Sequence, residues 1–176
     1  MTTASTSSRS TALAVARCRP SRAHPARGTA ELRAQAGKRL TGLRFTSNGA
    51  RVGPTPGAME LPDLKKFAPW LKELGWHAEI WAKCEFIVAA AADLKSYGIP
   101  VVFDHMGYFD KAKPVTDATF QDYLRLLRDG DFWVKLTPTR VTNLVGEYSD
   151  VRPFFEAIVK AIPDRVVFGS DWPYIS

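Results

Sequence analysis

The feature that most constrains the fold is a repeat of short apolar segments, each followed by a longer amphipathic one. Apolar segments typical of buried strands occupy residues 40–46, 76–81, 99–104, 132–137 and 166–170. Segments with helical periodicity lie between them, at residues 61–74, 84–97, 117–128 and 151–162. The strand centres recur roughly every 24 to 35 residues, which is the length of a strand with its helical crossover. The chain is therefore predicted to form an α/β fold with a parallel sheet.

Glycine and proline support the same boundaries. Gly75, Gly98 and Gly130 each follow a helical segment, where a left-handed cap is expected. Pro153 lies in the opening turn of the last helix, where its missing N–H group costs little. No Gly-x-Gly-x-x-Gly follows a strand, so a dinucleotide-binding open sheet lacks its fingerprint. The pattern alone leaves two architectures, a small open sheet or part of a barrel, because a (β/α)8 barrel needs eight strands.

Positive charge gathers in residues 1–28, which are rich in Ser, Thr, Ala and Arg and have no acidic residue. This composition is typical of a disordered leader, so residues 29–176 are predicted to form the domain. Five arginines in the leader supply most of the net charge of +6, which leaves +1 for residues 29–176. The domain therefore has no basic stripe for nucleic acid. The leader is either a transit peptide or the product of a mis-called start, and we favour the second.

The cysteines and the apolar runs indicate in which cellular compartment the chain is expected. Cys18 and Cys84 form no CxxC or CxxH spacing, so we expect unpaired thiols, no zinc framework and a cytoplasmic location. The longest apolar run, residues 86–92, is broken by Asp93 and Lys95 and is far shorter than a membrane span. No membrane partner is expected.

Polar residues at the ends of the predicted strands are the candidate site, because reactive groups gather at the carboxyl ends of parallel strands. Asp171 ends an apolar strand, and Asp104 and His105 end another. If their side chains meet at the carboxyl-end edge of the sheet, which we call the mouth of the site, the carboxylate can deprotonate a water and the imidazole can polarise a carbonyl. They could equally be two ligands of a metal, although catalytic zinc usually has at least three protein ligands.

Three arginines form a second group of candidates, Arg44, Arg51 and Arg140. Their planar guanidinium groups suit bidentate carboxylate binding, and the alternative is solvated surface charge. The two interpretations are balanced for Arg44 and Arg140, whereas surface charge is favoured for Arg51 in its Gly/Pro-rich loop. Glu79 lies within a predicted strand and could face either side of the sheet.

Several blocks of residues 31–176 resemble the amidohydrolase-related family, in its 2-pyrone-4,6-dicarboxylate lactonase-like branch. The most specific are Asp104-His105-Met106-Gly107 and Gly169-Ser170-Asp171-Trp172-Pro173, taken together. The other matching blocks are Gly42-Leu43-Arg44-Phe45, Leu74-Gly75-Trp76-His77 and Asp131-Phe132-Trp133-Val134-Lys135-Leu136. The resemblance implies a partial (β/α)8 TIM barrel with about five of the eight strand–helix units.

The resemblance also implies a reaction, the hydrolytic opening of a carboxylate-bearing cyclic ester or amide. Asp171 would match the general base on the attacking water, and His105 the residue that polarises the scissile carbonyl. Arg44 and Arg140 would match the arginines that grip substrate carboxylates, and Arg51 matches more loosely. The lactonase-like branch implies no obligatory metal, whereas many relatives use a divalent ion such as Zn²⁺ or Mn²⁺.

The chain departs from the family pattern at several points. No His-x-His pair occurs in the sequence, Tyr174 stands where a histidine usually follows the Trp-Pro pair, and Tyr108 stands where an arginine often lies. These departures leave two other hypotheses, an inactive barrel fragment that at most binds carboxylates and a decarboxylase or other lyase on the same barrel. We also expect that the stop after Ser176 is premature and that exposed barrel edges promote self-association.

Overall fold

Parallel strands in sequence order form one sheet in the computed structural model, which describes residues 14–16, 34, 40–47 and 59–171. The order is β1-β2-β4-β5-β6-β7, and the short β3 pairs with β2. All of these pairings are parallel. The strands are β1 Ala14–Ala16, β2 Leu40–Thr46, β3 Met59–Glu60, β4 His77–Trp81, β5 Val101–Phe103, β6 Phe132–Leu136 and β7 Val166–Phe168.

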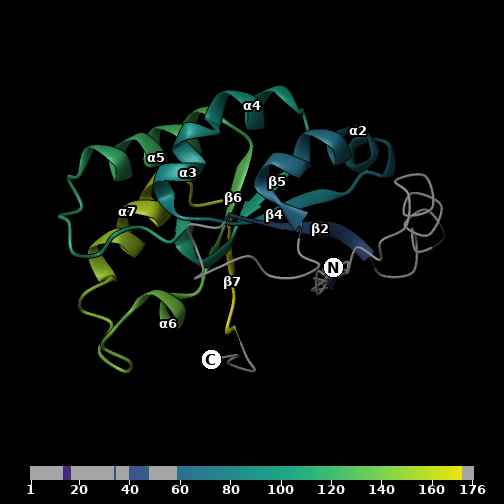
Figure 1. Cartoon of the computed structure of the whole chain (residues 1–176). Helices are drawn as coiled ribbons and strands as arrows, with labels where there is room; N and C mark the ends of the chain where they lie inside the picture. The colour runs from purple at the N-terminus through teal and green to yellow at the C-terminus, as the bar shows by residue number, and fades with distance from the viewer. Residues whose placement is uncertain (1–13, 17–33, 35–39, 48–58, 172–176) are drawn as a thin grey trace, which may run out of the picture.

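Helices connect successive strands (Figure 1). They are η2 Leu61–Asp63, α2 Leu64–Leu74, α3 Cys84–Ala89, α4 Ala91–Ser96, η3 Asp104–Gly107, α5 Ala118–Asp129, α6 Pro138–Val141 and α7 Arg152–Ala161. Of these, α2, α3, α4 and α5 lie together on one side of the sheet, whereas the short α6 lies apart from them beside β7 (Figure 1). From β2 to β7 the order never reverses, unlike that of a doubly wound sheet with its switch point. Right-handed crossovers then place the long helices on the same face. The prediction of an α/β fold consistent with a partial TIM barrel is confirmed.

The predicted strands and helices lie at the expected places, and the short β3 and η3 were not predicted. The helix predicted over 84–97 is interrupted at Ala90, whose φ of −87° and ψ of 2° separate α3 from α4. The short helix α6 follows β6 and was not predicted; Pro138 stands in its first turn, where a fixed φ favours a helical start. The break at Ala90 divides a segment whose helical type was predicted correctly, and α6 directly follows a predicted strand.

One of the three predicted glycine caps is wrong. Gly75 and Gly98 adopt left-handed φ values of 64° and 58°, whereas Gly130 is extended, with φ −123° and ψ 168°. A Cβ atom at position 130 would lie 2.1 Å from the ring of Phe132. Glycine is needed there for close packing against the start of β6 rather than for a left-handed cap.

Part of the predicted leader belongs to the sheet. Residues 14–16 form β1 and pair with β2. The composition of this segment does not indicate a strand. Its backbone forms one by hydrogen bonding to the edge of β2. The rest of residues 1–28 lies outside the described residues, and the domain boundary near residue 28 stays a prediction.

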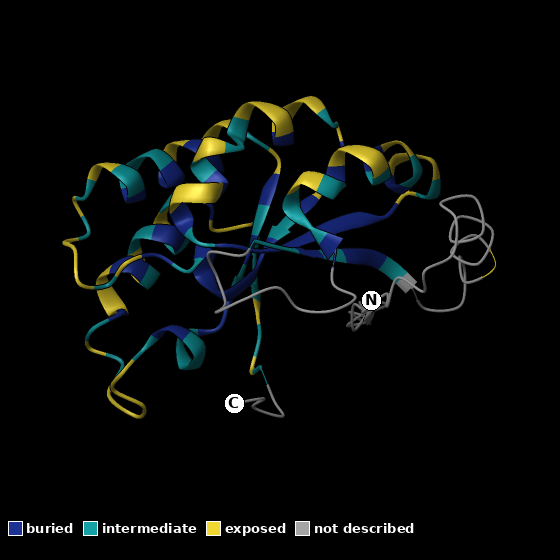
Figure 2. Cartoon of the chain, viewed as in Figure 1, coloured by how far each residue is buried: buried dark blue, intermediate teal, exposed yellow. Residues whose placement is uncertain are grey.

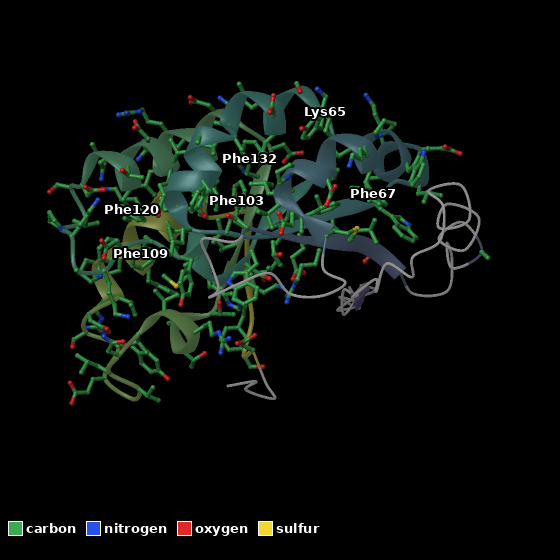
Figure 3. All side chains as sticks on the ribbon, in the orientation of Figure 1. Lys65, Phe67, Phe103, Phe109, Phe120 and Phe132 are labelled. Atoms are coloured by element: carbon green, nitrogen blue, oxygen red, sulfur yellow. The ribbon has the colours of Figure 1, made fainter. Side chains whose placement is uncertain are left out.

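The core lies between the sheet and the helices, where buried segments face each other (Figure 2). Its aromatic centre joins β5, β6, α5 and α7. The rings of Phe109 and Phe154 stack at 4.0 Å, and Phe103 contacts Phe132 at 5.4 Å. In Figure 3 the labelled rings of Phe103, Phe120 and Phe132 lie on the helical side of the sheet. The opposite side of the sheet is left for polar side chains.

Candidate active site

Alternation along the strands separates an apolar face from a charged one. Leu43, Phe45, Ile80, Phe103, Phe132 and Val134 are buried on the helical side. Residues at alternate positions face the other way. Arg44 of β2 lies in register with Glu79 of β4, and Lys135 of β6 faces the same side. Glu79, whose direction the sequence left open, therefore lies on the face opposite the buried apolar residues.

Four charged side chains meet on this face and form what we call the interior charge cluster: Arg44, Glu79, Asp104 and Lys135. The Arg44 guanidinium donates to Glu79, with Nε 2.5 Å from Oε1, and lies 2.7 Å from Asp104 Oδ2. Lys135 Nζ lies 2.8 Å from Asp104 Oδ1 and 3.0 Å from Glu79 Oε2. Each cation therefore contacts both carboxyl groups, and the formal charges balance.

The interior charge cluster is deeply buried on its acidic side, with Glu79 only 1% and Asp104 0% exposed. Burial, followed by the charge of Asp104, raises the pKa of Glu79, although Arg44 and Lys135 act in the opposite direction. Burial would lower the pKa of Arg44, but the carboxylates of Asp104 and Glu79 raise it further, and the net shift is upward. The two cations offset the charge of the two carboxyl groups and so lower the free-energy cost of burying them.

A left-handed turn follows Asp104 at the end of β5. His105, Met106, Gly107 and Tyr108 have φ values of 49°, 60°, 75° and 42°. Left-handed backbone costs about 1–2 kcal/mol for each non-glycine residue, so consecutive residues in this region are strained. Gly107 has a further reason to be glycine, because a Cβ atom there would lie 2.6 Å from the Tyr123 ring. Surrounding contacts must hold this turn.

His105 lies in the turn with its ring buried beside two neighbours. Its Nδ1 lies 2.9 Å from the hydroxyl oxygen of Thr137, and its ring meets Trp81 edge to face at 5.8 Å. Burial, the largest effect, lowers the pKa of His105 to about 4, and the cations of Arg44, Arg140 and Lys135 add to it. Asp171 acts in the opposite direction. The imidazole is consequently neutral at pH 7.

The buried neutral state of His105 makes stability depend on pH. The unfolded imidazole titrates near 6.5 and the folded one near 4. Between these values the unfolded chain binds a proton that the folded chain does not, so stability falls as the pH falls from 6.5 to 4. We expect the wild type to lose about 3 kcal/mol more than His105→Gln between pH 7 and pH 4. Urea unfolding at several pH values measures this; parallel losses in both proteins would contradict it.

Asp171 follows β7 and is held close to the turn. Its backbone is left-handed, with φ 57°, a region that Asp tolerates better than most residues. Arg140 of α6 approaches it, with Nε 3.6 Å from Oδ2, and both side chains are about one-third exposed or less. The Thr139 hydroxyl donates to the Ser170 carbonyl at 3.5 Å. The residues after β7 therefore contact α6, and the carboxylate of Asp171 remains partly exposed to solvent.

The structure brings four of the five predicted site residues to one mouth. His105 and Asp171 interact electrostatically, Arg140 pairs with Asp171, and Arg44 acts on His105 from the interior charge cluster. Arg51 lies outside the described residues. Lys135 and Thr137 are polar residues at the end of the strand predicted over 132–137, but the sequence assigned them no role in the site.

A pocket of 960 Å³ opens beside this mouth, between the segments that follow β5 and β6. Tyr108, Lys111, Arg140 and Thr142 are among the residues that line it. Lys111 donates to the carbonyl of Val141 at 2.5 Å and so joins the two segments. The pocket gives a small molecule access to Arg140.

The sequence left open whether the site binds a divalent metal ion, which would need several His, Cys, Asp or Glu ligands close together. In residues 59–171 and the shorter described segments, no group of three or more His, Cys, Asp or Glu side chains could hold a metal ion. We derive no chemical step through a metal ion. A search of the same residues for membrane-spanning helices found no candidate that is both long and apolar enough.

The chain is similar to known proteins of one family. The model of the amidohydrolase family matches residues 13–176, which extends the resemblance into the predicted leader. A 4-sulfomuconolactone hydrolase of Hydrogenophaga intermedia is 32% identical over 140 residues, covering 78% of this chain and 45% of the relative. A 2-pyrone-4,6-dicarboxylate hydrolase of Comamonas testosteroni is also 32% identical, covering 77% of this chain and 46% of the relative.

Solved structures show the same likeness. A chain from Pseudomonas putida assigned as a 2-pyrone-4,6-dicarboxylic acid hydrolase superposes with a TM-score of 0.69 at 26% identity. The superposition covers 84% of this chain and 54% of that one. The chain thus spans about half the length of the curated relatives that it matches. With the family model matched over most of its residues, the chain belongs to the amidohydrolase family.

Proposed function

We propose that the site opens a carboxylate-bearing lactone by attack of water. The observation that carries the proposal is the approach of Asp171, His105 and Arg140 at the carboxyl ends of β5, β6 and β7. A base, a polar group for the carbonyl and a cation for a carboxylate are the groups that such a reaction needs. Lactone hydrolases among the relatives support the same reaction class.

In the proposed reaction Asp171 accepts the proton of a water whose oxygen bonds to the lactone carbonyl carbon. When Nδ1 of His105 accepts from the Thr137 hydroxyl, Nε2 carries the ring proton and can donate to the carbonyl oxygen. The tetrahedral intermediate then collapses with cleavage of the ring C–O bond. The proton held by Asp171 passes to the leaving oxygen, and the product is the open-chain acid.

The arginines have unequal parts in the proposal. Arg140 lines the pocket, and its partly exposed side chain binds one carboxylate of the substrate. Arg44 already contacts the two buried carboxyl groups of the interior charge cluster, so we assign it a weaker substrate contact than the sequence suggested. Arg51 keeps its predicted carboxylate contact as a hypothesis. Single Arg→Met variants, compared by their KM values, rank the three.

The test is an assay of the purified chain on 2-pyrone-4,6-dicarboxylate, with chelator and with added Zn²⁺ or Mn²⁺. We expect disappearance of the pyrone absorbance above the buffer rate and no release of CO₂. A raised melting temperature without turnover would instead support a silent carboxylate binder, which the lack of His-x-His in the sequence favours. Released CO₂ would point to a lyase.

We also propose that the chain associates with itself through the edge of β7. Among the described residues β7 pairs only with β6, and Phe168 is 83% exposed there. Phe168→Lys is expected to shift the protein toward monomer in sedimentation velocity. Phe86→Lys is the control, because Phe86 is 41% exposed but lies on α3, away from the edge. A monodisperse wild-type monomer would contradict the proposal.

The cytoplasmic location is likewise a proposal. Cys84 is a free, buried thiol, and burial raises its pKa to about 12, which keeps it protonated. A thiol in this state suits a reducing compartment without requiring one. Fractionation of the native cells tests the location, and recovery from a secreted or organellar fraction would refute it.

A further inference from the structure

The strained turn after β5 needs an anchor, and the interior charge cluster lies at its first residue. Asp104 opens the turn, is 0% exposed, and has a cation on each carboxylate oxygen. His105 follows directly and is the residue that the proposed reaction uses. Any movement of Asp104 would pass to the His105 ring through one peptide unit.

Lys135 near the end of β6 and Thr137, the residue directly after β6, contact both of these neighbouring residues. Lys135 lies 2.8 Å from Asp104, and Thr137 lies 2.9 Å from His105. The two side chains lie close together, because a Cβ atom at Gly169 would meet both of them. The segment from β6 into α6 therefore contacts the turn at two consecutive residues, through an ion pair and through a hydrogen bond.

Strand β7 closes against the same two side chains. A Cβ atom at Gly169 would lie 2.6 Å from Thr137 Cγ2 and 2.9 Å from Lys135 Cγ. The absence of a side chain at Gly169, the residue after β7, thus lets the chain approach Lys135 and Thr137 closely, two residues before Asp171. The supports of His105 and the position of Asp171 share one packed interface.

We infer that Lys135, acting through the buried carboxylate of Asp104, is a positioning residue that holds the left-handed turn and orients the His105 ring. The inference deepens the proposed function, since it rests on the proposed part of His105 in the reaction. Lys135 contacts the two buried carboxylates of Glu79 and Asp104, so we assign it to positioning and not to substrate binding. Arg44 also pairs with Asp104, but it lies on β2, whereas Lys135 lies two residues before the Thr137 that contacts the His105 ring.

The test reads the ring itself. Nitrogen-15 spectra at pH 7 report the tautomer of each of the three histidines, assigned with His→Gln variants. In the wild type we expect one fixed tautomer for His105, which Thr137→Val disturbs. In Lys135→Met we expect an averaged tautomer and no further response to Thr137→Val. Lys66→Met is the control, because Lys66 pairs with Asp63 at 3.1 Å on the exposed surface.

Two further variants separate positioning from loss of charge or of folding. Lys135→Arg keeps the cation and should restore most of the fixed tautomer. If Lys135→Met fails to fold, Glu79→Gln with Lys135→Met leaves the balanced Arg44–Asp104 pair, and His105 should still lose its fixed tautomer. A wild-type tautomer with a full Thr137→Val response in either variant lacking Lys135 would overturn the inference. Because no turnover is measured, failure of the proposed lactone hydrolysis is recognised separately.

Discussion

Asp171→Asn is expected to lower kcat/KM for lactone hydrolysis by about 10²–10⁴-fold, the usual contribution of a positioned general base. The amide keeps the size of the side chain and its place beside Arg140, but it cannot accept the proton of the attacking water. Since Asp171 is 26% exposed, the substitution should leave stability nearly unchanged. The loss should therefore appear in the chemical step rather than in the amount of folded protein.

Steady-state kinetics of wild type and variant, with stability checked by urea unfolding, measure this effect. Asp164→Asn is the matched control, because Asp164 is an exposed aspartate before β7 that contacts none of the proposed site residues among the described interactions. Hydrolysis that proceeds equally well in Asp171→Asn would remove Asp171 as the base. A loss of the same size in Asp164→Asn would show that the effect is not specific to the site.

Arg44→Met is expected to destabilise the protein by about 3–5 kcal/mol, the usual cost of removing one partner from a buried ion pair. The substitution deprives Glu79 and Asp104 of one of their two cations and leaves a net negative charge inside the sheet. The cost should shrink at acid pH, because burial and Asp104 raise the pKa of Glu79 and its protonation removes that charge. The destabilisation is thus largest above the folded pKa of Glu79.

Chemical denaturation at neutral and acid pH measures this cost. Arg125→Met is the control, because Arg125 pairs with Asp122 on α5 with both side chains exposed. Exposed pairs contribute about 0–1 kcal/mol, so the control should change little. Equal and small losses in the two variants would show that the interior charge cluster does not stabilise the sheet.

Much of the fold could be predicted because its signals are local. The runs around Val101 and Val166 and the helical period of residues 118–129 each depend on neighbours within one turn or strand. The positions that the sequence did not indicate depend on contacts made in the folded chain. Gly130 is extended where a side chain would collide with the ring of Phe132, and β1 forms by pairing with β2. Periodicity and composition show neither contact.

The site could be predicted only as a set of strand ends. Parallel topology brings Arg44, His105, Arg140 and Asp171 to one mouth, so reading the ends of the strands located them. It could not show that Arg44 contacts two buried carboxyl groups or that Lys135 lies between them. Those contacts depend on the register between β2, β4 and β6, which residues far apart in the chain set together.

By itself, the sequence determined the order of strands and helices, the acid after β7 and the family blocks, because periodicity and strand-end composition are properties of short segments. The tertiary structure alone decided the direction of Glu79, the neutral state of His105 and the left-handed turn that carries it. The physical reason is that burial and charge compensation arise only when strands from different parts of the chain pair. Asp171 is thus a sequence-level prediction, and its surroundings are a product of packing.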